Sequence, residues 1–98
     1  MSKPLYITVI IECKPARMEE CLTMALKTRD KSLKESGCLQ FNVTQSNQDL
    51  GKIILLETYE DHASFEKHQE QEYMQDFGTM AANEFAQKIQ FFMSLPVD

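Results

Sequence analysis

The stretch from Glu57 to Phe77 holds the residues with the clearest capacity for chemistry. It contains both histidines of the chain, His62 and His68. An imidazole titrates near neutral pH, so His68 could serve as a general base or as an orienting donor. Glu57 ends an apolar run, and a carboxylate on an apolar strand face must be paired, protonated or catalytic. Two roles are open for Glu57: an orienting partner of His68, or a pocket residue in its own right.

Helical spacing places several of these residues on one face. Phe65, His68, Gln69 and Glu72 recur at steps of three and four, so one helix face would carry them toward the sheet. The alternative for His68 is a half-buried histidine bonded to Glu57 or to a backbone carbonyl.

The second histidine is expected to be exposed beside Asp61, which is a good N-cap residue for this helix. Histidines six residues apart point to different helix faces, so His62 and His68 predict no shared metal ion.

Further side chains are candidates for contact with a substrate. The Tyr73 hydroxyl could hold a substrate oxygen, although such a ring is often part of the core with a solvated tip. Phe65 and Phe77 would line the same pocket. Asn42 lies on the polar face of a predicted strand and could line a cavity, or else face solvent.

The elements that must position these residues follow from hydrophobic periodicity. Strands are predicted over 5–11, 38–45, 52–59 and 89–95, because these segments are rich in β-branched residues or alternate apolar with polar ones. Leu39, Phe41 and Val43 should share one face of the second strand.

Helices are predicted between these strands. The first should run from Pro15 to Ser36, with Gly37 as its C′ stop. The second should run from Asp61 to about Gln69. A further helix is expected to follow, and Gly78 weakens it in the middle. The residues on its inner side would be Tyr73, Met74, Phe77, Met80, Ala81 and Phe85.

The resulting order is β-α-β-β-α-β, an α+β ferredoxin-like fold whose helices cover one face of a four-stranded antiparallel sheet. We expect a single domain over residues 1–98. The first, third and fourth strands carry apolar residues on both faces. One layer of helices can cover only one of these faces. An uncovered apolar face is a partner surface, so the sequence predicts a homodimer formed sheet against sheet.

Composition excludes several classes of protein. A net charge of −5 disfavours nucleic-acid binding, because phosphate contacts need a basic stripe. No apolar run is long enough to span a bilayer, and the N-terminus lacks a signal-peptide pattern. Three cysteines without a CxxC spacing predict neither a disulfide framework nor a zinc site. We expect a cytoplasmic protein that binds neither nucleic acid nor membrane.

Three motifs in this order resemble the antibiotic biosynthesis monooxygenase domain family, whose members are dimeric α+β barrel proteins. The first motif is Glu35-Ser-Gly-Cys-Leu-Gln-Phe41, the second is Glu57-Thr-Tyr-Glu-Asp61, and the third is Ala63-Ser-Phe-Glu-Lys-His68. The resemblance spans nearly the whole chain and looks closest to the branch of quinol monooxygenases and related aldehyde-sugar-processing proteins.

The resemblance implies oxygenation without a cofactor. A quinol, phenol or anthrone would be deprotonated, and its anion would pass electrons directly to molecular oxygen. By position His68 matches the family's histidine and Glu57 its strand-end glutamate. The haem-degrading branch has an axial histidine ten residues after His68, where this chain has Gly78.

Two other functions are compatible with the same residues. One is isomerisation or degradation of a small hydroxylated or phosphorylated carbonyl compound, which needs the base but no oxygen. The other is a non-catalytic dimer whose pocket holds a hydrophobic metabolite.

Overall fold

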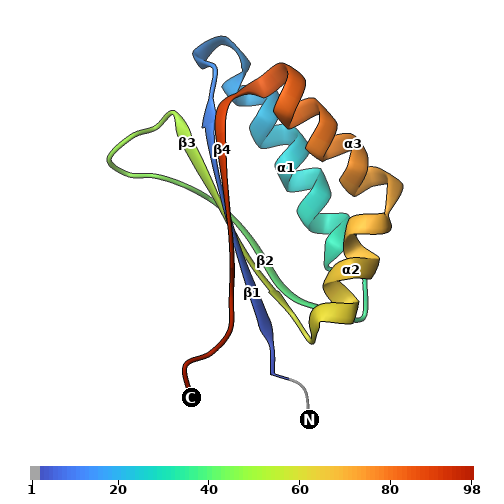
Figure 1. Ribbon diagram of the computed structural model, residues 1–98. Coiled ribbons are helices and arrows are strands. Elements are labelled where there is room, and N and C mark those ends of the chain that lie inside the picture. Colours follow the sequence, from blue (N-terminus) through green and yellow to red (C-terminus); the bar gives the residue numbers. More distant parts are fainter. Residues whose placement is uncertain (1–2) are drawn as a thin grey trace.

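The predicted strands form one four-stranded antiparallel sheet with the order β2-β3-β1-β4, and the helices pack on one of its faces (Figure 1). The computed structural model describes residues 3–98. The elements run in order as β1 (Leu5–Cys13), η1 (Pro15–Arg17), α1 (Met18–Ser32), β2 (Cys38–Gln45), β3 (Lys52–Tyr59), α2 (His62–Glu70), α3 (Glu72–Met80), η2 (Ala81–Phe85) and β4 (Ala86–Ser94). This confirms the ferredoxin-like fold.

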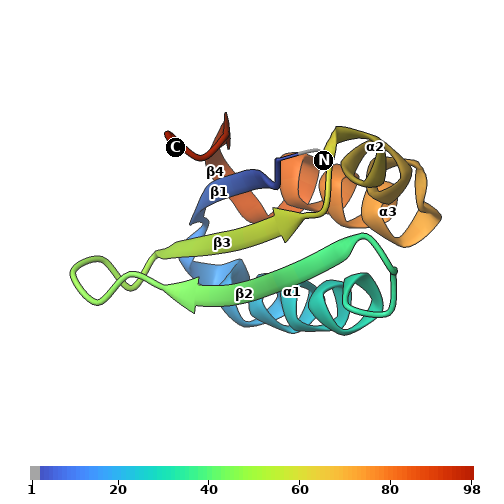
Figure 2. The same ribbon diagram turned by 90° about the horizontal axis from the view of Figure 1, so that it is seen from below.

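Alternation along the two central strands builds the core beneath the helices. Odd-numbered residues of β1 and β3 are buried against the helical layer, among them Ile7, Ile11 and Leu55. A strand turns successive side chains to opposite faces, so Glu57 shares the buried face with Leu55. β3 lies between β2 and β1 (Figure 2), and this central place carries Glu57 into the interior.

The outer face of the sheet is partly apolar and has no helix over it (Figure 1). Leu56, Thr8 and Phe92 lie opposite one another in the registers of β3, β1 and β4. Leu56 is 40% exposed and Phe92 is 50% exposed. The expectation that apolar residues occupy both sheet faces is therefore met, and the outer face is open.

Several element boundaries differ from the sequence prediction, among them the end of β1, which lies at Cys13 rather than at residue 11. The first α-helix ends at Ser32 rather than Ser36, because Lys34 and Glu35 donate to carbonyls three residues back and tighten the chain into a turn. The last strand begins at Ala86, three residues earlier than predicted, directly after the π-helical segment η2. Gly78 does not interrupt α3, which runs through it.

Leu39 was expected on the inner face of the second strand, and this is wrong. Cys38 pairs with Tyr59 while Gln40 pairs with the adjacent Thr58, so Leu39 is an extra residue in the ladder. A bulge of this kind reverses the alternation locally. Leu39 is consequently 57% exposed, whereas Cys38 and Phe41 are buried.

Gly37 is required for close packing rather than as a left-handed helix stop. Among the described residues no glycine has a positive φ, so the C′ role predicted for Gly37 is wrong. A Cβ atom on Gly37 would lie 2.4 Å from the Cβ atom of Ser64 in α2. Ser64 cannot rotate this atom away, because its position is set by the helix backbone.

We therefore expect Gly37→Ala to lower the free energy of unfolding by about 1–3 kcal/mol, as overpacking does. Urea titration of the variant measures the loss. Gly78→Ala is the matched control, since a Cβ atom at Gly78 meets nothing within 4 Å. It should raise stability by about 1 kcal/mol, because alanine is the better helix former. Equal effects of the two variants would contradict this account.

No helix in the described part of the chain is both long and apolar enough to cross a membrane.

Candidate active site

His68 is held in the interior by α2. The helix begins at its predicted N-cap, where the Asp61 carboxylate accepts from the backbone N–H of Ser64 at 2.8 Å. One helical face then buries Phe65 and His68, which are 3% and 1% exposed. Ring centroids lie 5.0 Å apart between His68 and Tyr59 of β3. The imidazole is therefore fixed by packing on a central strand.

The Nδ1 atom of His68 meets a carboxylate that the sequence did not pair with it. Glu35, in the turn between α1 and β2, places its Oε2 atom 3.0 Å from Nδ1. The same oxygen accepts from the Tyr73 hydroxyl. Burial, followed by the bond to Glu35, raises the pKa of Tyr73, which keeps this phenol protonated as a donor.

The Nε2 atom of His68 is buried without a hydrogen-bond partner among the described residues. The Oε1 atom of Glu57 lies 3.9 Å from Nε2, which is too far for a hydrogen bond. A buried polar atom left without a partner costs about 1–3 kcal/mol. A single oxygen atom of a ligand could reach both Nε2 and Glu57 across this gap.

Glu57 is a buried carboxyl group whose pKa is raised above its ordinary value. Its side chain accepts a hydrogen bond of 2.5 Å from the Tyr59 hydroxyl, two residues along the same strand face. Burial raises the pKa of Glu57 to about 7, and the bond from Tyr59 opposes only part of this rise. Glu57 is thus protonated in a large fraction of molecules at neutral pH, and a protonated carboxyl can donate a hydrogen bond.

A small apolar cavity adjoins these two groups. Its volume is about 140 Å³, and it lies between the sheet, α2 and α3. Glu57 and His68 are the ionisable side chains among the described residues that line it; the remaining lining residues are Ile7, Val9, Ile11, Leu55, Phe65, Gln69, Met74, Phe77, Gly78, Ala81, Ile89 and Phe91. Ile89 and Phe91 of β4 are about half exposed, so the cavity opens toward that edge of the sheet.

The structure brings together four of the six predicted site residues. His68, Glu57, Phe65 and Phe77 all contribute to the cavity wall. His68 is buried next to the cavity, and its role as a site residue stays a prediction. The orienting partner of its Nδ1 atom is Glu35, however, and Glu57 faces Nε2 instead.

The other two predicted residues lie elsewhere. Tyr73 is not among the residues that line the cavity, and its hydroxyl contacts Glu35 and Ser32. Asn42 is exposed and pairs with Leu56, whose side chain is on the outer face of the sheet. The alternation of β2 resumes after the bulge with Phe41 inward, and this turns Asn42 away from the helices.

Sequence reasoning missed Glu35 and Tyr59 as partners in this site. Glu35 stands in the motif that carries the family resemblance, but it was placed inside a helix. Its contact with His68 joins positions 33 residues apart, and no periodicity reports such a pair. Tyr59 could have been found from the strand spacing, since Glu57 and Tyr59 share one face.

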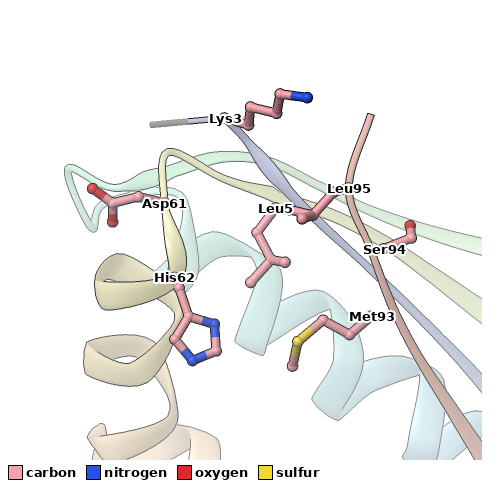
Figure 3. Close-up of a pocket in the computed structure, with 7 residues that line it drawn as sticks. All are labelled: Lys3, Leu5, Asp61, His62, Met93, Ser94 and Leu95. Carbon is pink, nitrogen blue, oxygen red and sulfur yellow. The ribbon is translucent and has the colours of Figure 1, made fainter. Parts of the chain in front are cut away.

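A larger hollow lies at the other end of α2 (Figure 3). Its volume is about 650 Å³, and it is lined by Lys3, Leu5, Asp61, His62, Met93, Ser94 and Leu95. Its polar side chains already have partners in part, because Asp61 caps α2 and His62 pairs with Glu66 at 3.0 Å. None of the ionisable side chains among its described lining residues is buried, so this hollow is the weaker candidate for chemistry.

No cluster of three or more His, Cys, Asp or Glu side chains within residues 3–98 is arranged to hold a metal ion.

Comparison with known proteins identifies related sequences and structures. The family model described as "Antibiotic biosynthesis monooxygenase" matches residues 4–79. A search of curated proteins finds no match to the sequence.

Three solved structures illustrate the likeness in fold. A protein from Pseudomonas aeruginosa is 24% identical, with a TM-score of 0.91 and coverage of 100% of this chain and 98% of its own. A Nitrosomonas europaea protein, provisionally named an antibiotic biosynthesis monooxygenase, is 18% identical, with a TM-score of 0.89 and coverage of 99% and 93%. A Bacteroides thetaiotaomicron protein of unknown function, described as a possible oxidoreductase, is 14% identical, with a TM-score of 0.91 and coverage of 98% and 100%.

Proposed function

Because this chain belongs to the antibiotic biosynthesis monooxygenase family, we propose that it oxygenates a single-ring phenol or quinol with molecular oxygen and without metal, flavin or haem. The observation that carries the proposal is the buried Nε2 atom of His68, which has no hydrogen-bond partner within residues 3–98 and lies 3.9 Å from the carboxyl group of Glu57. A substrate hydroxyl would supply the missing donor.

The two groups have complementary roles around one substrate oxygen. Nε2 of His68 takes the hydroxyl proton as a general base. Protonated Glu57 donates a hydrogen bond to the oxyanion that forms, as a buried neutral carboxyl can. The walls around this donor are mostly apolar, so it acts at a lower dielectric than in water.

The electrons for oxygen come from the substrate itself. The quinol anion is oxidised as a ring carbon–hydrogen bond is replaced by a carbon–oxygen bond and the oxygen–oxygen bond breaks. One oxygen atom enters the product, a hydroxyquinone, and the other leaves as water with two hydrogens from the quinol.

The size of the cavity limits the substrate. Its volume of about 140 Å³ is close to that of cavities that enclose a benzene ring, about 150 Å³. A phosphorylated substrate is disfavoured, because no lysine or arginine is among the described lining residues. We therefore favour an uncharged substrate with one ring.

Oxygen uptake by metal-stripped protein tests the proposal. Single-ring quinols should be consumed with one oxygen molecule per quinol, and three-ring anthrones should be consumed more slowly. No uptake above the rate of autoxidation with any member of the panel would refute it.

An isomerase for a small hydroxylated carbonyl compound is the second candidate, because the same pair could enolise a carbonyl without oxygen. Turnover of such compounds that persists under anaerobic conditions would favour this candidate over the monooxygenase.

The proposal includes a homodimer packed through the outer face of the sheet, supported by the exposed apolar row at Leu56 and Phe92. Leu56→Glu should place a charge in the centre of the interface and shift the protein to a monomer in sedimentation velocity at micromolar concentration. Leu50→Glu is the control, since Leu50 is 67% exposed in the turn before β3. A wild-type monomer would contradict the dimer.

We also place the protein in the cytoplasm. Cys13, Cys21 and Cys38 are free and buried, and burial raises the pKa of the Cys21 thiol to about 12 and that of Cys38 to about 11. Unpaired thiols of this kind suit a reducing compartment.

A further inference from the structure

One carboxylate oxygen, next to Nδ1 of the imidazole, contacts two hydrogen-bond donors. Oε2 of Glu35 lies 3.0 Å from Nδ1 of His68 and also contacts the Tyr73 hydroxyl. The Ser32 hydroxyl, 3.2 Å from Tyr73, donates its own proton to the Thr28 carbonyl at 2.7 Å. The Tyr73 hydroxyl can donate to Oγ of Ser32 or to Oε2 of Glu35. A carboxylate oxygen is a stronger acceptor than a hydroxyl, so the Tyr73 proton is directed to Glu35.

The backbone holds Glu35 in this place. Its N–H donates to the Ser32 carbonyl at 2.9 Å, and its own carbonyl accepts from the N–H of Cys38 at 3.1 Å. The turn is bonded to α1 on one side and to β2 on the other. The Glu35 side chain is 19% exposed, so the carboxylate is mostly shielded from solvent beside a histidine that is 1% exposed.

A neutral imidazole carries one proton, on either Nδ1 or Nε2. With the proton on Nε2, the Nδ1 lone pair would face the lone pairs of Oε2 at 3.0 Å, which is repulsive. The Nε2 proton would also lack an acceptor, since Glu57 is 3.9 Å away. With the proton on Nδ1, the contact to Glu35 is a hydrogen bond to a charged acceptor.

We propose that Glu35 is a positioning residue, held by Tyr73, that fixes the proton of neutral His68 on Nδ1 and so leaves the Nε2 lone pair for the ligand. The tautomer follows from the contacts alone; its consequence for catalysis rests on the proposed function. Glu35 is not among the described residues that line the cavity, so it would act through the imidazole. Free imidazole side chains favour the opposite tautomer, so the carboxylate is needed to reverse this preference.

Imidazole nitrogen NMR tests the assignment. The chain has two histidines, so ¹⁵N-histidine labelling gives two resolvable rings. At about pH 8.5, above the ordinary titration range of imidazole, His68 should show a protonated Nδ1 and a bare Nε2. In Glu35→Ala the proton should move mainly to Nε2. Exposed His62 is the internal reference.

Glu66→Ala is the matched control, because it removes the carboxylate partner of the other histidine. It should leave the His68 signals unchanged. The wild-type spectrum is decisive even where Glu35→Ala fails to fold: a proton on Nε2 of His68 overturns the proposal. A folded Glu35→Ala protein that keeps the proton on Nδ1 also overturns it.

Kinetics separates this proposal from the proposed function. Glu35→Ala should lower kcat at least about 10²-fold, the lower end of what a positioned base contributes, with KM changed only a few-fold. Wild-type protein that shows the Nδ1 tautomer but consumes no quinol would support the positioning role and refute the monooxygenase. A fall in kcat with an unchanged tautomer would refute the positioning role.

Discussion

Replacing His68 with glutamine is expected to lower kcat/KM for quinol oxygenation by a factor of about 10²–10⁴, the usual contribution of a positioned general base. Glutamine is similar in length and polar, so it should not leave the large void that alanine would create among the surrounding aromatic rings. Its amide cannot take a proton at neutral pH. The fall should therefore appear mainly in kcat, because the apolar walls that bind the ring are unchanged.

Oxygen uptake in air-saturated buffer, corrected for autoxidation, measures this effect. His62→Gln is the matched control, since His62 lies on the exposed side of the same helix and pairs with Glu66. It should retain the wild-type rate. Thermal melting of both variants shows whether the fold is kept. Equal rates in wild type and His68→Gln would remove this imidazole from the mechanism.

Glu57→Gln is expected to make the protein more stable above neutral pH. Burial raises the pKa of Glu57 from 4.5 to about 7, so the folded state binds this proton more tightly than the unfolded state does. The stability that Glu57 contributes to the wild-type protein is fully present below pH 4.5. It is lost as the pH rises toward and through 7. The full loss corresponds to about 3 kcal/mol. Glutamine has no charge to bury and can still accept from Tyr59.

Urea titrations at about pH 5 and about pH 8 measure the difference between the two proteins. It should be small at the lower pH and approach 3 kcal/mol in favour of the variant at the higher pH. Glu60→Gln, at an exposed position just after the strand, should leave the wild-type dependence on pH unchanged. A Glu57→Gln protein that is destabilised at both pH values would show that the buried carboxylate is stabilising.

The same titration should govern the rate. Ionisation of Glu57 removes the donor to the oxyanion, so kcat/KM is expected to fall as the pH rises above about 7. In Glu57→Gln the amide supplies a donor at every pH, and this fall should disappear. A wild-type rate that stays level through the titration of Glu57 would argue against the donor role.

The fold could be predicted from the sequence to a large extent because it depends on short-range periodicity. Alternation marked the strands, helical spacing marked Phe65 and His68, and the side chain of Asp61 marked the start of α2. One error arose because a glycine can be required for two different structural reasons. Gly37 was interpreted as a helix stop, whereas the close approach of Ser64 is what requires glycine there.

The bulge at Leu39 shows the limit of alternation. The residues on either side alternate regularly, and nothing in the sequence marks an inserted residue. Only the pairing of β2 with β3 determines that Leu39 is skipped, and this reverses the faces of the residues before it.

For the candidate site, the sequence by itself determined that His68 shares a helix face with Phe65 and that Glu57 lies on an apolar face of its strand. Only the tertiary structure decided that Glu35 contacts Nδ1, that Tyr73 donates to Glu35, and that Nε2 is buried near Glu57 with no hydrogen-bond partner among the described residues. The physical reason is range: periodicity reports which way a side chain points from its own element. A hydrogen bond between a turn and a helix 33 residues away depends on how those elements pack.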